Sequence, residues 1–393
     1  MGTPLTVCLV LLAILLGAGF ALDEGDSGTT SAAERSAPIA VIERRVEQIR
    51  ELKFRTLPRP QTVTPAQAKR EGLEDFDRSY PPARRRADEE VLKLLGLLEP
   101  DVDLRGVSAS IFGEAVAGYY DPRNGRLRVV EGAQTASRVL NEITLAHELT
   151  HALEDQRLDF DLEKSSGSDD RALAYLGLVE GSASAVMFTY AERHFSAEQT
   201  LGGLLSSLGA DTGDLPGFIQ AQLIFPYVSG QRFVERLHSA GGWEVINAAY
   251  RFRPPASTEQ IIHPDKYLEV EQPEQVEYDA GAVLGPGWRR VRAGTWGEWA
   301  TDALLLDAKA AAGWGGDRYE LWQRGDEPCE RPPCRDRDAL VMRWRWDTLR
   351  DAREFEAALR EWDEPAPVAI GSRGREVALA LAPSRALAQR LVE

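Results

Sequence analysis

The sequence lacks an excess of positive charge. With 46 lysines and arginines against 62 aspartates and glutamates, its formal net charge is −16. A chain this acidic suits neither nucleic acid nor an anionic membrane surface, so neither is expected as a partner. Internal repeats are also lacking. The rest of the composition, with 43% apolar and 27% charged residues among 393, is that of an ordinary globular protein with room for two or three domains.

Cysteine is scarce, with three in the chain. Cys8 lies within an N-terminal apolar run and not at its end, so a lipoprotein anchor is not expected. Cys329 and Cys334 lie in a proline-rich segment, and in an oxidising compartment they could form a disulfide. A second zinc site built on them is poorly supported, because no further Cys or His lies near them in the sequence.

The first residues differ from the rest of the chain. Residues 5–22 are apolar apart from one threonine, and Gly19 and Ala21 occupy the positions that a signal peptidase reads. Residues 1–21 are therefore predicted to be a secretory signal peptide, which makes the protein secreted or extracytoplasmic. About 18 apolar residues can just span a bilayer, so an uncleaved membrane anchor with the domain outside is the alternative. Residues 22–37 are predicted to be a disordered linker.

Histidine is also scarce, yet two of the five histidines lie in one short motif. His147, Glu148 and His151 form the pattern H-E-x-x-H, which is expected by chance on the order of once in a hundred such chains or less. The surrounding residues 140–154 are predicted to be helical, and residues four apart on a helix share a face. Both imidazoles can therefore bind one metal ion, and Glu148 can reach a water molecule at that ion.

The motif helix is predicted to be buried, because it is apolar around most of its circumference. Its apolar residues are Ile143, Leu145, Ala146, Leu149, Ala152 and Leu153. Histidines on a helix are often surface or satisfied core residues, but two histidines and a glutamate inside a buried helix need polar partners. A metal ion supplies such a partner, so Zn²⁺ is the predicted cofactor.

A catalytic zinc site needs three protein ligands and an open position. Residues 171–188 are predicted to form a second helix with its N-cap near Asp170. Glu180 is the one acid in this range, among small and apolar residues. Small neighbours such as Gly181 and Ser182 would let a second helix approach closely, as two helices that share an ion must. Glu180 is therefore the predicted third ligand.

The two segments together resemble the glutamate-zincin metallopeptidases, in which H-E-x-x-H is followed after a few dozen residues by E-x-x-A on a second helix. The resemblance is specific for residues 140–190, and the wider context of the motifs also resembles secreted bacterial proteins of this kind. It implies that His147, His151 and Glu180 bind zinc and that Glu148 is the general base.

One position departs from the pattern of that group. Several members carry an acid four residues after the ligand glutamate, where it steadies a histidine. Here that position is Ser184, whose hydroxyl bonds an imidazole more weakly than a carboxylate does. Asp155 could substitute for it, because it lies four residues after His151 on the same face, although an exposed acid near the helix end is the simpler interpretation.

Zinc peptidases usually carry a later His or Tyr that helps to stabilise the oxyanion of the reaction. His263 precedes a proline and is expected in a loop, which makes it the first candidate. Tyr267 is the second candidate. A purely structural role is the alternative for His263. His194 and His238 have weaker claims, since neither lies in a loop-like setting.

Short strands are predicted ahead of the motif helix at residues 108–113, 116–120 and 127–130, with a turn at 121–125. In the peptidases that the chain resembles, a small antiparallel sheet lies at this point, and its edge strand lines the cleft and pairs with the substrate. Residues 111–120 are the candidates for that strand, and an ordinary core hairpin is the alternative.

The predicted fold class is α+β, mainly helical, with a zincin-like core at 38–312 and a small α+β domain at 313–393. Further helices are predicted in the core at 38–56, 64–79, 82–98, 215–262 with breaks at Pro226, Gly241-Gly242 and Pro254-Pro255, and 294–312. In the C-terminal domain, strands at 319–322, 339–346, 368–370 and 376–381 and helices at 349–362 and 384–392 give the order β-β-α-β-β-α.

These features predict a secreted zinc peptidase that hydrolyses a peptide or protein substrate by metal-activated water, with Glu148 as general base. The alternative is a secreted zinc-binding cell-envelope or interaction protein without hydrolytic activity, against which the intact Glu148 counts. A helical scaffold without metal is the third possibility, and metal analysis would separate it from the other two.

Overall fold

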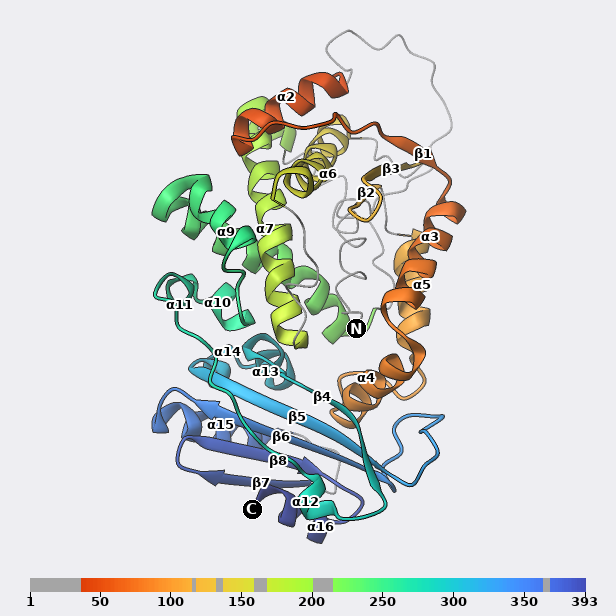
Figure 1. Ribbon diagram of the computed structural model, residues 1–393, viewed down its shortest axis with the longest axis vertical. Coiled ribbons are helices and arrows are strands. Elements are labelled where there is room, and N and C mark those ends of the chain that lie inside the picture. The colour runs from red at the N-terminus through yellow and green to blue at the C-terminus, as the bar shows by residue number, and fades with distance from the viewer. Residues whose placement is uncertain (1–36, 115–117, 132–136, 159–167, 201–214, 363–367) are drawn as a thin grey trace.

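The computed structural model describes residues 37–393 apart from 115–117, 132–136, 159–167, 201–214 and 363–367. The predicted signal peptide and nearly all of the predicted linker lie outside the described residues. Figure 1 shows a helical unit stacked on a five-stranded sheet, so the fold is mainly helical and of the α+β class, as predicted.

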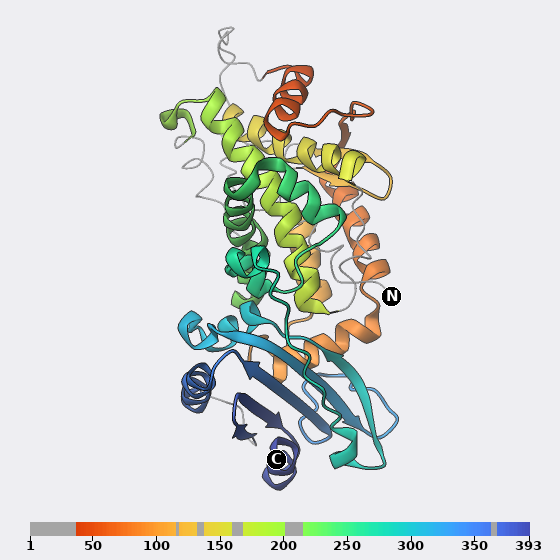
Figure 2. The same cartoon turned by 60° about the vertical axis from the view of Figure 1, so that its left-hand side comes forward.

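The helical unit is built around α7, most of whose residues are buried. Its helices are α2 (Ile39–Arg50), α3 (Pro65–Ser79), α4 (Pro82–Leu94), α5 (Leu104–Glu114), α6 (Arg138–Leu158), α7 (Asp169–His194), α9 (Gly217–Arg251), α10 (Thr258–Ile262) and α11 (Pro264–Leu268). The long helix α9 packs along α7, while α2 and α6 pack against α7 as well (Figures 1 and 2). Helix α7 is apolar and long enough to cross a membrane, but 83% of its apolar window is buried inside this core.

A small sheet lies beside α6 and carries the strand that reaches the H-E-x-x-H motif. Its strands are β1 (Gln61–Val63), β2 (Gly118–Asp121) and β3 (Arg126–Val130), in the order β1-β3-β2. Strand β2 is antiparallel to β3 and forms an edge, as predicted, whereas β1 joins β3 in parallel. The sheet is therefore mixed, and the prediction of a purely antiparallel sheet was wrong, because the short β1 was not recognised as a strand.

The strand predicted at 108–113 is wrong, because these residues belong to α5. Residues Leu104, Ser108 and Ile111 are buried at helical spacing, and the Asp103 carboxylate accepts the backbone N–H of Gly106 at the start of the helix. The predicted strand covers only part of this helix, so the helical spacing of buried residues that starts at Leu104 cannot be recognised within residues 108–113. The candidate edge strand at 111–120 is thereby reduced to its last residues, which lie in β2.

Two predicted helix boundaries also differ from the structure. The break predicted at Pro226 is wrong, because α9 continues through this residue. The break predicted at Gly241-Gly242 is present, since the backbone leaves helical geometry there and Gly242 has a φ of 66°. The helix predicted at 294–312 is divided into α13 (Glu298–Leu305) and α14 (Ala308–Ala311). Leu306 separates them with a left-handed φ of 52°.

The C-terminal unit is an antiparallel sheet of order β4-β5-β6-β8-β7. Its elements are α12 (Gly281–Leu284), β4 (Trp288–Gly294), β5 (Trp314–Arg324), β6 (Asp338–Trp346), α15 (Leu349–Glu361), β7 (Val368–Arg373), β8 (Glu376–Leu381) and α16 (Arg385–Val392). The predicted β-β-α-β-β-α order is present from β5 to α16. Strand β4 precedes the predicted boundary at 313, so that boundary lies too late. The reason is that β4 is an edge strand without a clear buried alternation.

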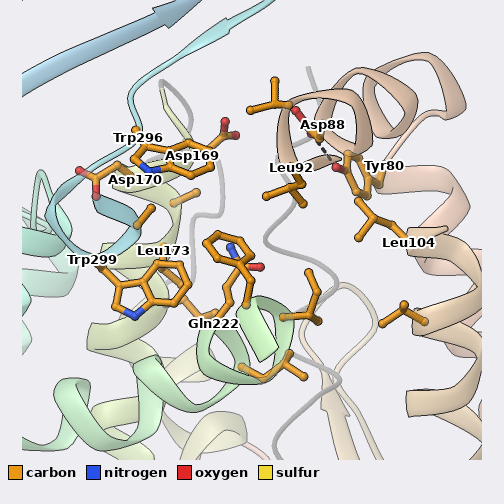
Figure 3. Close-up of a pocket in the computed structure, with 18 of the residues that line it drawn as sticks. Tyr80, Asp88, Leu92, Leu104, Asp169, Asp170, Leu173, Gln222, Trp296 and Trp299 are labelled. Carbon is orange, nitrogen blue, oxygen red and sulfur yellow. Dashed lines mark hydrogen bonds between the residues drawn. The ribbon is translucent and has the colours of Figure 1, made fainter. Parts of the chain in front are cut away.

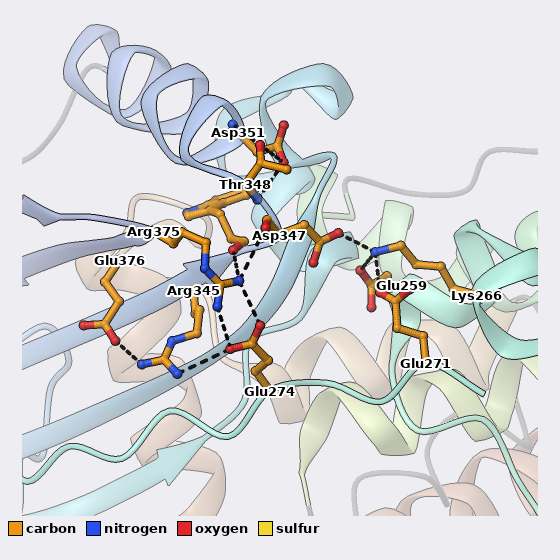
Figure 4. A network of polar contacts seen from close by, with 11 residues as sticks. Glu259, Lys266, Glu271, Glu274, Arg345, Asp347, Thr348, Asp351, Arg375 and Glu376 are labelled. Atoms are coloured by element: carbon orange, nitrogen blue, oxygen red, sulfur yellow. Dashed lines mark hydrogen bonds and ion pairs between the residues drawn. The ribbon is translucent and has the colours of Figure 1, made fainter. Parts of the chain in front are cut away.

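Ion pairs join the helical unit to the C-terminal sheet (Figure 4). The Lys266 ammonium of α11 lies 2.6 Å from Glu259, 2.8 Å from Glu271 and 2.6 Å from Asp347, which follows β6. These three acids lie close enough together to hold a metal ion, but the Lys266 ammonium already lies among them and pairs with each. In the loop between β5 and β6, Cys329 and Cys334 form a disulfide.

Candidate metal centre

Two neighbouring buried helices bring the predicted metal ligands together. Helix α6 carries His147, Glu148 and His151, and α7 carries Glu180. The Ser168 hydroxyl caps α7 by accepting the backbone N–H of Arg171, which fixes where the helix starts. His147 and Glu180 are 0% exposed, and His151 is 3% exposed.

The ligand atoms of the three residues face one another. The Nε2 atoms of His147 and His151 lie 2.9 Å apart, and each lies 3.2 Å from the same carboxylate oxygen of Glu180. A tetrahedral zinc site with bonds near 2.1 Å separates its ligand atoms by about 3.4 Å. Two imidazoles and one carboxylate are also a donor set used by catalytic zinc. The three residues therefore fit zinc in both spacing and chemistry.

The pKa values of the two buried histidines shift in opposite directions. Burial lowers the pKa of His147 well below its usual value, and the charge of His151 adds to this effect. Burial also disfavours a charged His151, but the carboxylates of Glu180, Glu148 and Glu154 outweigh it and raise the His151 pKa to about 9. In the metal-free cluster the surrounding carboxylates therefore favour a proton on His151, whereas burial disfavours one on His147.

Zinc is expected to bind more tightly as the pH rises, because the metal must displace the proton on His151. Between pH 6 and 8 the apparent association constant should increase at least about tenfold per pH unit, since at least one proton is released per ion bound. Competition with a chelator, corrected for the protonation of the chelator itself, measures this. Equal affinities at pH 6 and pH 8 would show that His151 carries no proton in the metal-free protein.

Glu148 lies beside the cluster and is 4% exposed. Burial raises its pKa to about 8, and the Glu180 charge adds to the rise, whereas the charge of His151 and the backbone N–H of Tyr120 oppose it. Tyr120 belongs to β2, so the edge strand of the small sheet lies next to the motif glutamate. A carboxylate whose pKa lies near the working pH is suited to general base catalysis.

The sequence offers two candidate hydrogen-bond partners for a ligand histidine, Asp155 and Ser184. Asp155 accepts a hydrogen bond from the Tyr120 hydroxyl at 2.6 Å and so ties the end of α6 to β2. Ser184 is buried, at 2% exposure. Neither is shown to contact a ligand histidine in the described part of the chain.

A buried ion pair that the sequence did not reveal supports the ligand helices. Glu154, one turn beyond His151, lies 2.5 Å from Arg50 of α2, and both side chains are 0% exposed. Its carboxylate also accepts from the Ser182 hydroxyl of α7 and, at 2.9 Å, from the Tyr250 hydroxyl of α9. Four helices therefore meet at one carboxylate, which holds α6 and α7 in register behind the metal ligands.

The predicted oxyanion donors lie elsewhere. The Nε2 atom of His263 bonds Glu298 at 2.8 Å, and the Tyr267 hydroxyl donates to the backbone carbonyl of Arg253 at 2.8 Å. Among the described contacts neither residue reaches the ligand cluster. His194 and His238 pack on the rings of Tyr190 and Trp243. The reason for the difference is that α10 and α11 direct His263 toward Glu298 of α13 and Tyr267 toward Phe233 of α9.

Tyr227 of α9 lies beside the ligand cluster. Its ring centre lies 6.4 Å from that of His147, and its hydroxyl lies beside Glu180, where it opposes the rise that burial causes in the Glu180 pKa. The side chain is 7% exposed. The sequence gives no sign of this proximity, because it depends on how α9 crosses α7.

Comparison with known proteins reaches only the C-terminal unit. Residues 283–389 match a family described as a domain of unknown function, DUF8575, a range that includes every strand of the five-stranded sheet. Curated proteins and solved structures give no match.

Proposed function

We propose that the protein is a zinc-dependent peptidase that acts outside the cytoplasm. The observation that carries the proposal is the convergence of the His147 and His151 imidazoles and the Glu180 carboxylate at 2.9–3.2 Å, with Glu148 beside them. The resemblance of residues 140–190 to the glutamate-zincin metallopeptidases supports the same assignment. The predicted signal peptide and the Cys329–Cys334 disulfide support an oxidising compartment.

In this mechanism His147, His151 and Glu180 would hold the zinc ion, which when bound polarises water and the scissile carbonyl. Glu148 accepts the proton of the attacking water and then delivers it to the leaving amine. The burial of Glu148 keeps bulk water from competing for that proton. Strand β2, which places its Tyr120 N–H against Glu148, is the edge against which an extended peptide would align.

Tyr227 is the proposed donor for the oxyanion. Its hydroxyl is buried beside the Glu180 carboxylate, so it can turn to a carbonyl oxygen on which negative charge develops. Donors already in place in a water-poor site need no reorganisation when that charge appears. His263 and Tyr267, bonded to Glu298 and Arg253, are not assigned to this role.

Metal analysis combined with a cleavage assay tests the proposal. We expect the purified chain to hold about one zinc ion, to cleave an unfolded substrate such as casein, and to lose cleavage when a chelator removes the ion. In the same assay Tyr227→Phe should keep the zinc and lower kcat by roughly 10²-fold. Bound zinc without cleavage would favour a zinc-binding envelope or interaction protein instead. Less than about a tenth of an ion per chain would reject the metal site itself.

A further inference from the structure

An apolar cavity of about 180 Å³ lies where the helical unit meets the C-terminal unit (Figure 3). It is surrounded by helices α3, α4, α5, α7, α9 and α13, by the segment between β4 and α13, and by strand β5. Its walls include Leu92, Leu173, Leu176, Leu223, Trp296 and Trp299. Phe218 stacks on Trp296 with ring centres 6.0 Å apart, so aromatic surface forms a large part of the lining.

The cavity and the metal centre share the same helix faces. Leu176 in the cavity wall lies four residues before Glu180 on α7, and Leu223 lies four residues before Tyr227 on α9. Residues four apart on a helix lie on one face, about 6 Å apart along the axis. Both helices therefore run from the cavity wall to the metal centre within one turn. Helix α5, which supplies a third wall, precedes the strand that contacts Glu148.

The acids around the cavity do not offer free charge to a ligand. Asp88 lies 2.5 Å from Arg292, and Asp169 accepts from the Tyr319 hydroxyl at 2.9 Å as well as from Arg292. Asp170 accepts the backbone N–H of Thr258 at 3.1 Å. Because these carboxylates are already bonded within the protein, the cavity does not select a cationic ligand.

Two uncharged polar groups remain available in the lining. The Gln222 amide makes no hydrogen bond within the described part of the chain, and Figure 3 shows it among the apolar side chains of the cavity. The indole nitrogen of Trp296 is buried and likewise has no acceptor among the described residues. Donors of this kind suit the neutral amide of a peptide, whereas the rest of the lining suits an apolar side chain.

We propose that this cavity receives a bulky apolar side chain, of phenyl size, from the residue next to the scissile bond of a peptide substrate. The proposal rests on the peptidase function proposed above. An apolar cavity of about 150 Å³ accepts benzene, so 180 Å³ accommodates a phenyl ring. Trp296 and Tyr319 belong to the segment that matches the domain of unknown function, so this C-terminal unit completes the specificity pocket.

Mapping the cleavage sites in casein by mass spectrometry tests the pocket. With the zinc-loaded parent we expect Phe, Tyr, Trp and Leu to be enriched on one side of the cleaved bonds, about tenfold over Ala and Gly. Leu223→Trp fills the cavity and should remove this enrichment. Leu223→Ala enlarges the cavity and should increase the share of Trp at the cleaved bonds. Val228→Trp adds the same ring on an exposed part of α9 outside the cavity and should leave the preference unchanged.

A binding measurement separates this proposal from the peptidase proposal. N-acetyl-phenylalanine amide should bind the zinc-loaded Glu148→Gln protein at least about tenfold more tightly than N-acetyl-alanine amide, and Leu223→Trp should abolish the difference. If casein is not cleaved but this preference is found, the proposed peptidase function is wrong, while the cavity still binds apolar side chains. Equal binding of the two amides, or a preference unaffected by Leu223→Trp, would overturn the pocket.

Discussion

Glu148→Gln is expected to lower kcat for peptide hydrolysis by roughly 10²–10⁴-fold while the zinc content stays at that of the parent. Glutamine has nearly the same shape as glutamate but cannot accept the proton of the attacking water. Because Glu148 lies beside the ligand atoms and is not one of them, the spacing of His147, His151 and Glu180 should survive the change. Initial rates on a fluorogenic peptide together with metal analysis of the same sample measure both effects.

The matched control is Glu131→Gln, which makes the same chemical change on an exposed side chain just after β3. Its rate should equal that of the parent. Should Glu148→Gln cleave within threefold of the parent rate, another group would have to be the base. Loss of zinc from Glu148→Gln would instead show that this carboxylate holds the ion or its surroundings in place.

The local part of the metal centre could be predicted from the sequence. The spacing of His147 and His151 places both on one helix face, and Glu180 stands out as the one acid of an apolar helix. Both signals depend on residues within a few turns of each other. The structure brings these three residues together, as the sequence suggested. In the C-terminal unit the same kind of local pattern correctly gave the order from β5 to α16.

The parts that the sequence did not reveal depend on how helices cross. Tyr227 lies at the centre because α9 crosses α7 there, and no pattern within α9 encodes that crossing. Arg50 and Glu154 form their buried pair across 104 residues of chain. The loop-like setting of His263 does not determine which way its side chain points, and in the structure it bonds Glu298.

Gly181→Ala is expected to destabilise the protein, because α7 and α9 touch through their backbones at this residue. A Cβ atom on Gly181 would lie 2.2 Å from the carbonyl carbon and oxygen of Gly230, and one on Gly230 would lie 2.1 Å from the carbonyl oxygen of Gly177. Backbone atoms cannot rotate away, so the helices must move apart. The small residues around Glu180 are predicted to let the other ligand helix, α6, approach closely. Ser182 does face α6, whereas Gly181 contacts α9 instead.

The expected loss is about 2–3 kcal/mol of unfolding free energy, which overrides the roughly 1 kcal/mol by which alanine favours a helix over glycine. The melting temperature should fall by about 5–10 °C for a unit of this size, and thermal unfolding at a fixed scan rate measures it. Gly217→Ala is the control, since a Cβ atom there would meet nothing within 4 Å, and it should melt at or slightly above the parent temperature. Zinc affinity should fall with Gly181→Ala but not with Gly217→Ala, because Glu180 adjoins the contact and Tyr227 lies one turn from Gly230. If Gly181→Ala melts like the parent and keeps its zinc affinity, this backbone contact does not set the geometry of the metal centre.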